Sequence, residues 1–408
     1  MYKKIDKVVL LVMSFLLISG QNTIWFRFSF IKFISIISIL LITVYSFFRI
    51  LPILKRNEFY KIVITIIGIC SGVIAISLFQ GKNRIAFLFN FCVIFNCIAI
   101  ISIFIGKYKY KIMIYMNKII ILISSISLVF YFLGSIFHVI SPLSYFMLNW
   151  GRNFLTENYF YLYYSYQNTT LAGMVIPRNS SIFLEPAIFS FYLVFSLIIE
   201  LFYKTTPSKK NIVLMIICLF TTFSTIGLIL MLLILGIKFI FLPMKNKLGQ
   251  YLRLYFIPII IVCISISAYF VLLDKIDNQY GNKSFDVRMN DIEIGIEAFL
   301  DKPIVGWGYR YSDDYKSRQL TSIRGSDISG GSNGLIVILY QCGVIIFCFY
   351  IITFILGYKL NRKDNGGKFS IIFYIYLLIY LFTIPIMYSW FLIYIMSFGI
   401  YKITIDSP

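Results

Sequence analysis

Long apolar runs recur along almost the whole chain, and they constrain the fold more than any other feature. Runs of about 18 residues or more can cross a hydrocarbon core of about 30 Å as helices. A transmembrane barrel would instead alternate apolar and polar residues, and runs such as IISILLITVYSFF do not alternate. Apolar runs lie near 8–20, 28–48, 62–80, 85–105, 119–140, 185–203, 211–223, 225–242, 254–273, 332–357, 369–384 and 386–403. The sequence therefore predicts an all-α polytopic membrane protein of about twelve transmembrane helices, with residues 1–408 forming a single integral membrane domain.

Three features of this assignment leave alternatives open. Only TTFSTIG separates the runs at 211–223 and 225–242. The last two runs are separated near Pro385, which either ends a helix or kinks one longer helix. The first run follows Met1 to Lys7 as in a signal peptide, but no A-x-A site follows it. We therefore expect an uncleaved first helix.

Lys and Arg residues are concentrated in every second connection between these runs. Cytoplasmic loops of membrane proteins are enriched in these residues. With twelve spans and both termini inside, most of the 37 basic residues fall on the cytoplasmic side. The net charge of +20 then reflects orientation, so we expect no nucleic-acid partner. The sequence predicts a multi-pass protein of the bacterial inner (cytoplasmic) membrane with both termini cytoplasmic.

Two outer segments, 141–184 and 274–331, are longer than ordinary connections, and loops of this length are usually functional or disordered. The first loop carries Trp150 and a tyrosine-rich run, YFYLYYSY, so we expect it to be ordered. Helical periodicity in the second loop predicts an amphipathic helix near 286–300. All seven cysteines lie in apolar segments, so no disulfide framework is expected.

The end of the first outer loop, PRNSSIFLEPAIFSFYLV, contains the first candidate site residues. Arg178 precedes Glu185 by seven residues, and Glu185-Pro186 stands where the next helix begins. Proline suits the first turn, and a carboxylate is stabilised by the positive end of the helix dipole, so a purely structural pair is one reading. Charges at membrane depth are costly unless they face a cavity, so catalytic roles for Arg178 and Glu185 are the favoured reading.

The second outer loop contains the segment SFDVRMNDIEIGIEAFLDKPIVGWGYR. Its Arg288 lies three residues before Asp291, and such a pair on a solvated helix is worth only about 0.2–0.5 kcal/mol. Pro303 ends the helix, and a glycine-rich turn leads to Arg310. Arg288 is a catalytic candidate, although the ordinary surface pair is the alternative reading.

Farther along, SDISGGSNGLIVILYQCGV leads into the next apolar run, and Arg318 and Arg324 lie just before it. Ser332 and Asn333 are good N-cap residues, so simple capping is the default reading. The same helix end offers N–H groups and a positive dipole to an anion. We therefore also treat Ser332 and Asn333 as candidate substrate-binding residues.

Arginine is suited to bidentate phosphate recognition, and the outer loops collect five arginines: Arg178, Arg288, Arg310, Arg318 and Arg324. Such a set suits a pyrophosphate-linked lipid. Adjacent Asp313 and Asp314 without further ligands are weak evidence for a metal, so we assign no metal and no cofactor. The lone histidine, His138, is expected to be an interfacial anchor.

Taken together, these motifs resemble those of the O-antigen polymerases, the Wzy-type enzymes, within the wider superfamily that includes the O-antigen ligases. The resemblance rests on four elements in order: R-x6-EP (Arg178, Glu185, Pro186), T-x-S-x-x-G (Thr222, Ser224, Gly227), R-x14-P-x2-G-x-G (Arg288, Pro303, Gly306, Gly308) and SNG-x4-LY-x2-G (Ser332 to Gly343). It implies a GT-C-like glycosyltransferase that acts on the periplasmic side without a nucleotide sugar.

The resemblance also implies the substrates and partners. A polymerase of this kind transfers a growing glycan from undecaprenyl pyrophosphate onto an undecaprenyl-pyrophosphate-linked repeat unit, beside a chain-length regulator and a flippase of the same pathway. Arg178 and Arg288 would stabilise the leaving pyrophosphate, and Glu185 would orient or deprotonate the acceptor hydroxyl. Arg310, Arg318, Arg324, Ser332 and Asn333 would bind substrate.

Other classes remain as alternatives. Ligases carry a histidine directly before the asparagine at the start of the helix that follows the second loop, whereas this chain has Ser332 there, which favours a polymerase. A lipid-linked oligosaccharide flippase would also have about twelve spans, but its charges would lie deeper within helices. A membrane acyltransferase would need an intramembrane histidine with an acidic partner, which His138 lacks in the sequence.

Overall fold

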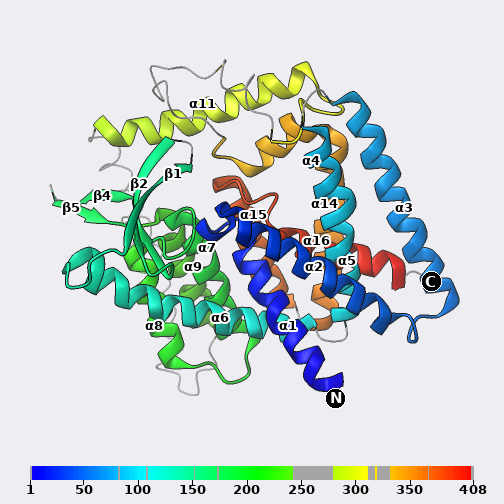
Figure 1. The fold of residues 1–408 in the computed structure, drawn as a ribbon, viewed down its shortest axis with the longest axis horizontal. Coiled ribbons are helices and arrows are strands. Elements are labelled where there is room, and N and C mark those ends of the chain that lie inside the picture. The colour runs from blue at the N-terminus through cyan, green and yellow to red at the C-terminus, as the bar shows by residue number, and fades with distance from the viewer. Residues whose placement is uncertain are drawn as a thin grey trace.

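The computed structural model describes residues 2–80, 83–106, 109–150, 152–171, 174–241, 279–310, 318, 331–365 and 367–405, and this part is mostly helical (Figure 1). Its helices are α1 (Tyr2–Ser19), η1 (Ile24–Arg27), α2 (Ser29–Ile50), α3 (Arg56–Phe79), α4 (Arg84–Leu88), η2 (Phe89–Ile94), α5 (Phe95–Gly106), α6 (Lys109–Phe130), η3 (Tyr131–Ile136), α7 (Pro186–Ile198), η4 (Ile199–Tyr203), α8 (Lys209–Thr222), α9 (Thr225–Phe241), α11 (Gln279–Asp301), α14 (Gly334–Asn365), α15 (Gly367–Thr383) and α16 (Trp390–Ile405).

Several of these helices are long and apolar enough to cross a membrane, which makes the chain a polytopic membrane protein. Within the described residues six helices meet this standard: Ser29–Ile50, Arg56–Phe79, Arg84–Gly106, Lys111–Ile136, Pro186–Tyr203 and Gly334–Arg362. Shorter apolar helices cover Thr225–Phe239 and Gly367–Thr383. The run expected at 254–273 lies outside the described residues, so the number of twelve crossings stays a prediction.

The sequence left open whether the chain breaks at two positions, and at each of them the structure has two separate helices. Phe223 adopts a left-handed conformation (φ 47°) and ends α8. Farther along, α15 ends at Thr383 and α16 begins at Trp390, so the proline between them ends a helix rather than kinking one.

The expectation of an all-α chain is wrong in the first outer loop, which folds into two small antiparallel sheets. The first sheet has the order β1 (Ser144–Trp150), β2 (Arg152–Tyr159) and β3 (Tyr163–Ser165). In the second sheet β4 (Asn168–Leu171) pairs with β5 (Met174–Pro177). Tyrosine and threonine favour strands because they pack well on a pleated surface, and Tyr159 and Tyr163 are buried beneath the turn between β2 and β3.

Helix α7 lies at the centre of one half of the fold, and it packs against α6, α8, α9 and α15. Every residue from Ile188 to Ile198 is buried. A helix that is apolar on all sides is stable only when it is surrounded by other elements or by lipid. This central position fixes where Glu185, the residue before α7, stands in the structure.

A buried carboxylate holds the far end of this helix in place. Glu200 is fully buried and accepts hydrogen bonds from Asn117 Nδ2 (2.8 Å), Asn211 Nδ2 (3.0 Å) and the Ser208 amide (3.2 Å), and it forms an ion pair with Lys204. A buried charge is tolerated only when it is paired and hydrogen-bonded. The network therefore ties α6 and α8 to the end of α7.

The second outer loop is joined to α14 by main-chain hydrogen bonds. Helix α14 is interrupted at Gly343, which has φ 75° and ψ 178°. The interruption leaves helix carbonyls available, and the Trp307 amide donates to Tyr340 O (2.9 Å) while the Gly308 amide donates to Gln341 O (2.9 Å). On the other side of the break the Val344 amide donates to the Pro303 carbonyl (2.8 Å).

Both glycines in this junction are required by close backbone approach. A Cβ atom on Gly343 would lie 2.1 Å from the Ile304 carbonyl oxygen, and one on Gly306 would lie 2.5 Å from the Gln341 carbonyl. Both positions also have positive φ, which L side chains rarely adopt. The P-x2-G-x-G and LY-x2-G elements are therefore two halves of one junction.

We expect Gly343→Ala to destabilise the protein by about 3 kcal/mol or more, because it combines positive-φ strain with a backbone clash. The measurement is thermal unfolding of the purified protein in detergent. Gly72→Ala in α3 is the matched control, because a Cβ there meets nothing within 4 Å and alanine favours the helix by about 1 kcal/mol. Equal melting temperatures for the two variants would contradict the proposed junction.

Candidate functional site

Arg178 lies between β5 and α7, and it joins the two parts of the chain that carry the first two motif elements. Its amide donates to Gln167 O (2.8 Å), its Nε donates to Thr222 O (3.1 Å), and its Nη2 approaches Phe223 O at 3.4 Å. A cation is stabilised at a helix C-terminus, where carbonyl groups lack partners within the helix. Arg178 therefore caps α8 and keeps the R-x6-EP and T-x-S-x-x-G elements together.

Glu185 stands at the N-cap position of α7, as its place before Pro186 indicates. The residue is extended (φ −153°, ψ 148°), and its side chain makes no capping hydrogen bond to the helix. Its carboxylate instead interacts electrostatically with Arg178 and with Tyr166. The structure thus brings together Arg178 and Glu185, the two candidates from the first outer loop.

Tyr166 is a third member of this group that the sequence analysis did not single out. Its hydroxyl oxygen is buried and makes no hydrogen bond among the described residues. Burial raises the pKa of Tyr166 well above its usual value, Glu185 raises it further, and Arg178 and Arg27 oppose the rise. Tyr166 is therefore a protonated donor at neutral pH, with no acceptor in the described part of the chain.

Arg27 adds a second cation from a distant part of the sequence. It lies at the end of η1, in the short turn between α1 and α2, and its side chain is partly exposed. Burial of the guanidinium lowers the pKa of Arg27, repulsion from Arg310 lowers it further, and Tyr166 acts in the opposite direction. A signal was present in the sequence, because Arg27 is a basic residue in a turn predicted to lie outside.

We use the name arginine cluster for five residues: Arg27, Tyr166, Arg178, Glu185 and Arg310. Burial lowers the pKa of Arg178, while Glu185 and Tyr166 raise it. The cluster holds three guanidinium groups and one carboxylate, so it carries a positive formal charge. Guanidinium groups bind phosphate and carboxylate through paired hydrogen bonds, so the cluster suits an anionic ligand.

Arg310 is held in position by the junction between the second outer loop and α14. Its backbone is left-handed (φ 55°), and its amide approaches Gln341 Oε1 at 3.2 Å. The guanidinium lies 5.4 Å from the ring centre of Tyr309 and 5.9 Å from that of Tyr388, and its Nη2 is 3.3 Å from Gln21 Oε1. The glycine junction thus determines where this cation stands.

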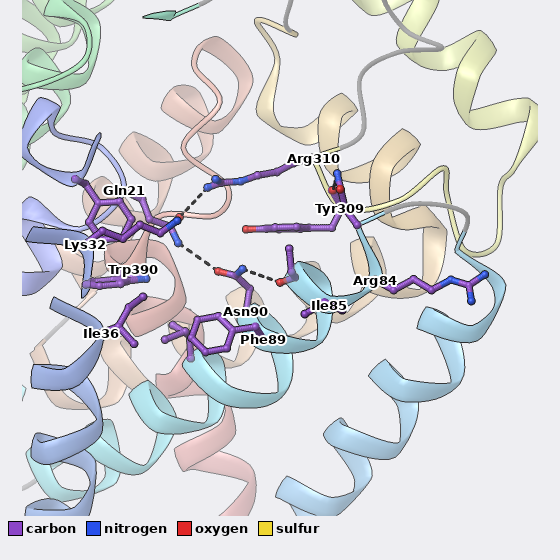
Figure 2. A pocket seen from close by; sticks show the side chains of 14 residues that line it. Gln21, Lys32, Ile36, Arg84, Ile85, Phe89, Asn90, Tyr309, Arg310 and Trp390 are labelled. Carbon is purple, nitrogen blue, oxygen red and sulfur yellow. Dashed lines mark hydrogen bonds between the residues drawn. The ribbon is translucent and has the colours of Figure 1, made fainter. Parts of the chain in front are cut away.

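An open pocket of about 940 Å³ lies beside Arg310 (Figure 2). The Tyr309 ring lies below Arg310 in this view, and the Gln21 and Asn90 amides lie on the side to which its hydroxyl points (Figure 2). Residues from five parts of the chain line the pocket: Gln21, Phe26, Lys32, Ile36, Asn83, Arg84, Ile85, Ala86, Phe89, Asn90, Ile94, Tyr309, Arg310 and Trp390. Arg310 therefore belongs both to the pocket and to the arginine cluster.

The remaining arginine candidates stand apart from this cluster. Arg288 is exposed on α11, the helix that crosses the top of Figure 1, and no hydrogen bond in the described part joins it to Arg178 or Glu185. Arg318 forms an ion pair with Asp301 and lies 6.0 Å from the Trp307 ring centre. Arg324 lies outside the described residues.

Ser332 and Asn333 have the contacts expected of a helix cap. Asn333 Oδ1 accepts hydrogen bonds from the amides of Leu335 (3.1 Å) and Ile336 (3.2 Å), and the Ser332 amide donates to Asp291 Oδ2 (2.9 Å). These contacts fix the start of α14 against α11. Substrate binding by Ser332 and Asn333 stays a prediction.

Comparison with known proteins finds that part of the chain is similar to one protein family. Residues 211–351 match the family model described as O-Antigen ligase. The matched region contains three of the four motif elements, and R-x6-EP lies just before it. No curated protein matches the chain. The family match supports a place in the O-antigen polymerase and ligase superfamily, with a role in O-antigen or polysaccharide assembly.

Proposed function

We propose that the protein is an O-antigen or related surface-polysaccharide polymerase. It transfers a growing glycan from undecaprenyl pyrophosphate onto an undecaprenyl-pyrophosphate-linked repeat unit, on the periplasmic side of the inner membrane. The observation that carries the proposal is the arginine cluster, in which the buried Tyr166 hydroxyl has no acceptor among the described residues. An anionic ligand would supply that acceptor.

The cluster has the chemistry needed to release a pyrophosphate. A guanidinium has five N–H donors, and the main-chain carbonyls of residues 222 and 223 engage only part of the Arg178 set. The remaining donors, with Arg27 and Tyr166, would bind the phosphate oxygens. Negative charge grows on these oxygens as the glycosidic bond breaks, and fixed cations stabilise that charge without rearrangement.

Glu185 would act on the acceptor. Its carboxylate lies within electrostatic reach of Arg178 and Tyr166, and its oxygens would accept a hydrogen bond from an attacking sugar hydroxyl. A hydroxyl oriented in this way attacks the anomeric carbon as the pyrophosphate leaves. Arg288, exposed on α11, would contact the glycan or its phosphates from the outer side.

A ligase is the second candidate, because the matching family model carries that description. The position directly before Asn333 favours the polymerase, since the resemblance implies a histidine there in ligases and this chain has Ser332. The one histidine of the chain, His138, is exposed near the end of η3.

The first test is a gel profile of lipopolysaccharide from cells that lack the gene and carry Arg178→Lys. Lysine keeps the charge but loses the forked donor geometry, so we expect polymer synthesis to fall about 100-fold or more. Complementation with the wild-type protein should restore the ladder, whereas the variant should leave single repeat units on the lipid A core.

The control for this test is Arg56→Lys, because Arg56 is the first residue of α3, is not a member of the arginine cluster, and has its Nε 3.3 Å from the Tyr60 hydroxyl. Both variants must be present in the membrane and melt close to the wild type, since Arg178 also caps α8. Long polymer held on undecaprenyl pyrophosphate with bare core would indicate a ligase. Repeat units trapped on the cytoplasmic side would indicate a flippase.

Tyr166→Phe gives a second prediction that separates function from structure. The hydroxyl makes no hydrogen bond among the described residues, so its removal should leave the melting temperature unchanged or raise it slightly. Loss of a hydrogen bond to a charged phosphate should lower the polymerisation rate about tenfold or more. Single-turnover assays with lipid-linked repeat units measure this rate.

Tyr164→Phe is the matched control for Tyr166. Its hydroxyl is also buried without a hydrogen-bond partner among the described residues, but the charged groups of the arginine cluster do not act on it. We expect Tyr164→Phe to keep the full rate. A Tyr166→Phe protein with the wild-type rate would remove Tyr166 from the site.

A further inference from the structure

The pocket beside Arg310 has an apolar side formed by helices that face lipid. Ile36 from α2 and Phe89 at the start of η2 line it together with Ile85 from α4. Ile85 is 85% exposed, the highest value among the large apolar side chains in the described part of the chain. On helices long enough to span a membrane, exposed apolar side chains face the hydrocarbon. The pocket is therefore open toward lipid between α2 and α4.

The opposite side of the pocket is polar and positively charged. Arg310 Nη2 lies 3.3 Å from Gln21 Oε1, and the Gln21 amide lies 3.3 Å from Asn90 Oδ1 (Figure 2). Lys32, which is exposed in the first turn of α2, adds a second cation to the lining. No acidic side chain is among the residues that line the pocket. An anion is thus the favoured ligand for this side.

Tyr309 supplies a second, independent sign that a ligand belongs here. Its hydroxyl is buried and makes no hydrogen bond among the described residues, and Figure 2 shows it directed toward Gln21. Burial raises the pKa of Tyr309 to about 12, so the hydroxyl keeps its proton at neutral pH. The nearby Arg310 can only donate hydrogen bonds, so it cannot accept one from this hydroxyl. An oxygen atom of a bound ligand would accept that hydrogen bond.

We propose that this pocket binds the isoprenoid phosphate end of the lipid-linked donor, which enters sideways from the bilayer between α2 and α4. The inference rests on the proposed function and extends it to a substrate route. The isoprenoid chain lies along Ile36, Ile85 and Phe89, and the phosphate oxygens contact Lys32, Tyr309 and Arg310. A ligand with an apolar chain and an anionic head matches the two sides of the pocket.

The donor fits this pocket better than the acceptor does. The leaving pyrophosphate belongs to the donor, and its charge must develop beside fixed cations. Arg310 lines the pocket and lies within electrostatic reach of Arg27, so Arg310 is the residue that the pocket and the arginine cluster share. An acceptor attacks through the sugar at its far end, so its own pyrophosphate lies one repeat unit away from the reaction.

The test is direct binding of farnesyl pyrophosphate to the purified full chain in phosphatidylcholine nanodiscs, measured by isothermal titration calorimetry. This probe has an isoprenoid chain and a pyrophosphate but no sugar, so binding does not require polymerase activity. Farnesol and inorganic pyrophosphate are the tail-only and head-only probes. We expect each to bind at least about tenfold more weakly than farnesyl pyrophosphate, because each engages one side of the pocket.

Two variants should weaken binding and one should not. Lys32→Gln should lower the affinity about tenfold by removing a charge-assisted contact, and Ala86→Trp should abolish binding by filling the pocket. Arg56→Gln is the control for net charge, because Arg56 at the start of α3 is not among the residues that line the pocket and its guanidinium lies over the Tyr60 ring. Equal losses of affinity for Lys32→Gln and Arg56→Gln would show that the effect comes from surface charge alone and would overturn the proposal.

Two further outcomes separate this inference from the proposed function. Polymer synthesis by a chain that binds no farnesyl pyrophosphate, or that is unaffected by Ala86→Trp, would overturn the pocket assignment and leave the polymerase intact. Binding with the expected variant pattern but no polymer synthesis would overturn the polymerase and keep the pocket. Loss of farnesyl pyrophosphate binding in phosphatidylglycerol nanodiscs would identify a site for bulk anionic lipid and overturn the donor assignment.

Discussion

The interruption of α14 at Gly343 is the constraint on which the rest of the site depends. An unbroken helix would use the carbonyls of residues 340 and 341 internally, and the second outer loop would have no main-chain partner there. Because the helix breaks, these carbonyls accept the amides of Trp307 and Gly308, and Tyr309 and Arg310 follow directly. One backbone irregularity therefore places Tyr309 and Arg310 in the pocket lining, and Arg310 also belongs to the arginine cluster.

Arg178 has a structural role that is compatible with the chemical role proposed for it. Its contacts with the carbonyls of Thr222 and Phe223 would stabilise the end of α8 in a protein without any substrate. Those contacts also fix the plane of the guanidinium, so under the proposed function its remaining donors would be oriented before a phosphate binds. The sequence alone could not separate the two readings, because both require an arginine seven residues before the glutamate.

The helices were predictable from the sequence because each apolar run carries its own signal of length and composition. The breaks at Phe223 and near Pro385 were visible as polar or proline interruptions, although their geometry was not. The strands of the first outer loop were missed, since short strands with many tyrosines carry weak periodicity and depend on packing against η3. Arg27 was missed for a related reason: it joins Tyr166 only through contacts between distant segments, which no local pattern records.

Arg288 stands apart from the arginine cluster, and this separation is compatible with a part in substrate binding. A reaction between two lipid-linked glycans must bind long, flexible sugar chains as well as their phosphates, and these chains extend away from the membrane. Arg288 is exposed on α11, whereas Arg178 and Tyr166 are half-buried, where under the proposed function a desolvated phosphate would gain most from each hydrogen bond. Under the proposed function, the half-buried cations would act on the breaking bond and the exposed cations on the glycan, and a spread of arginines over both environments suits such a substrate.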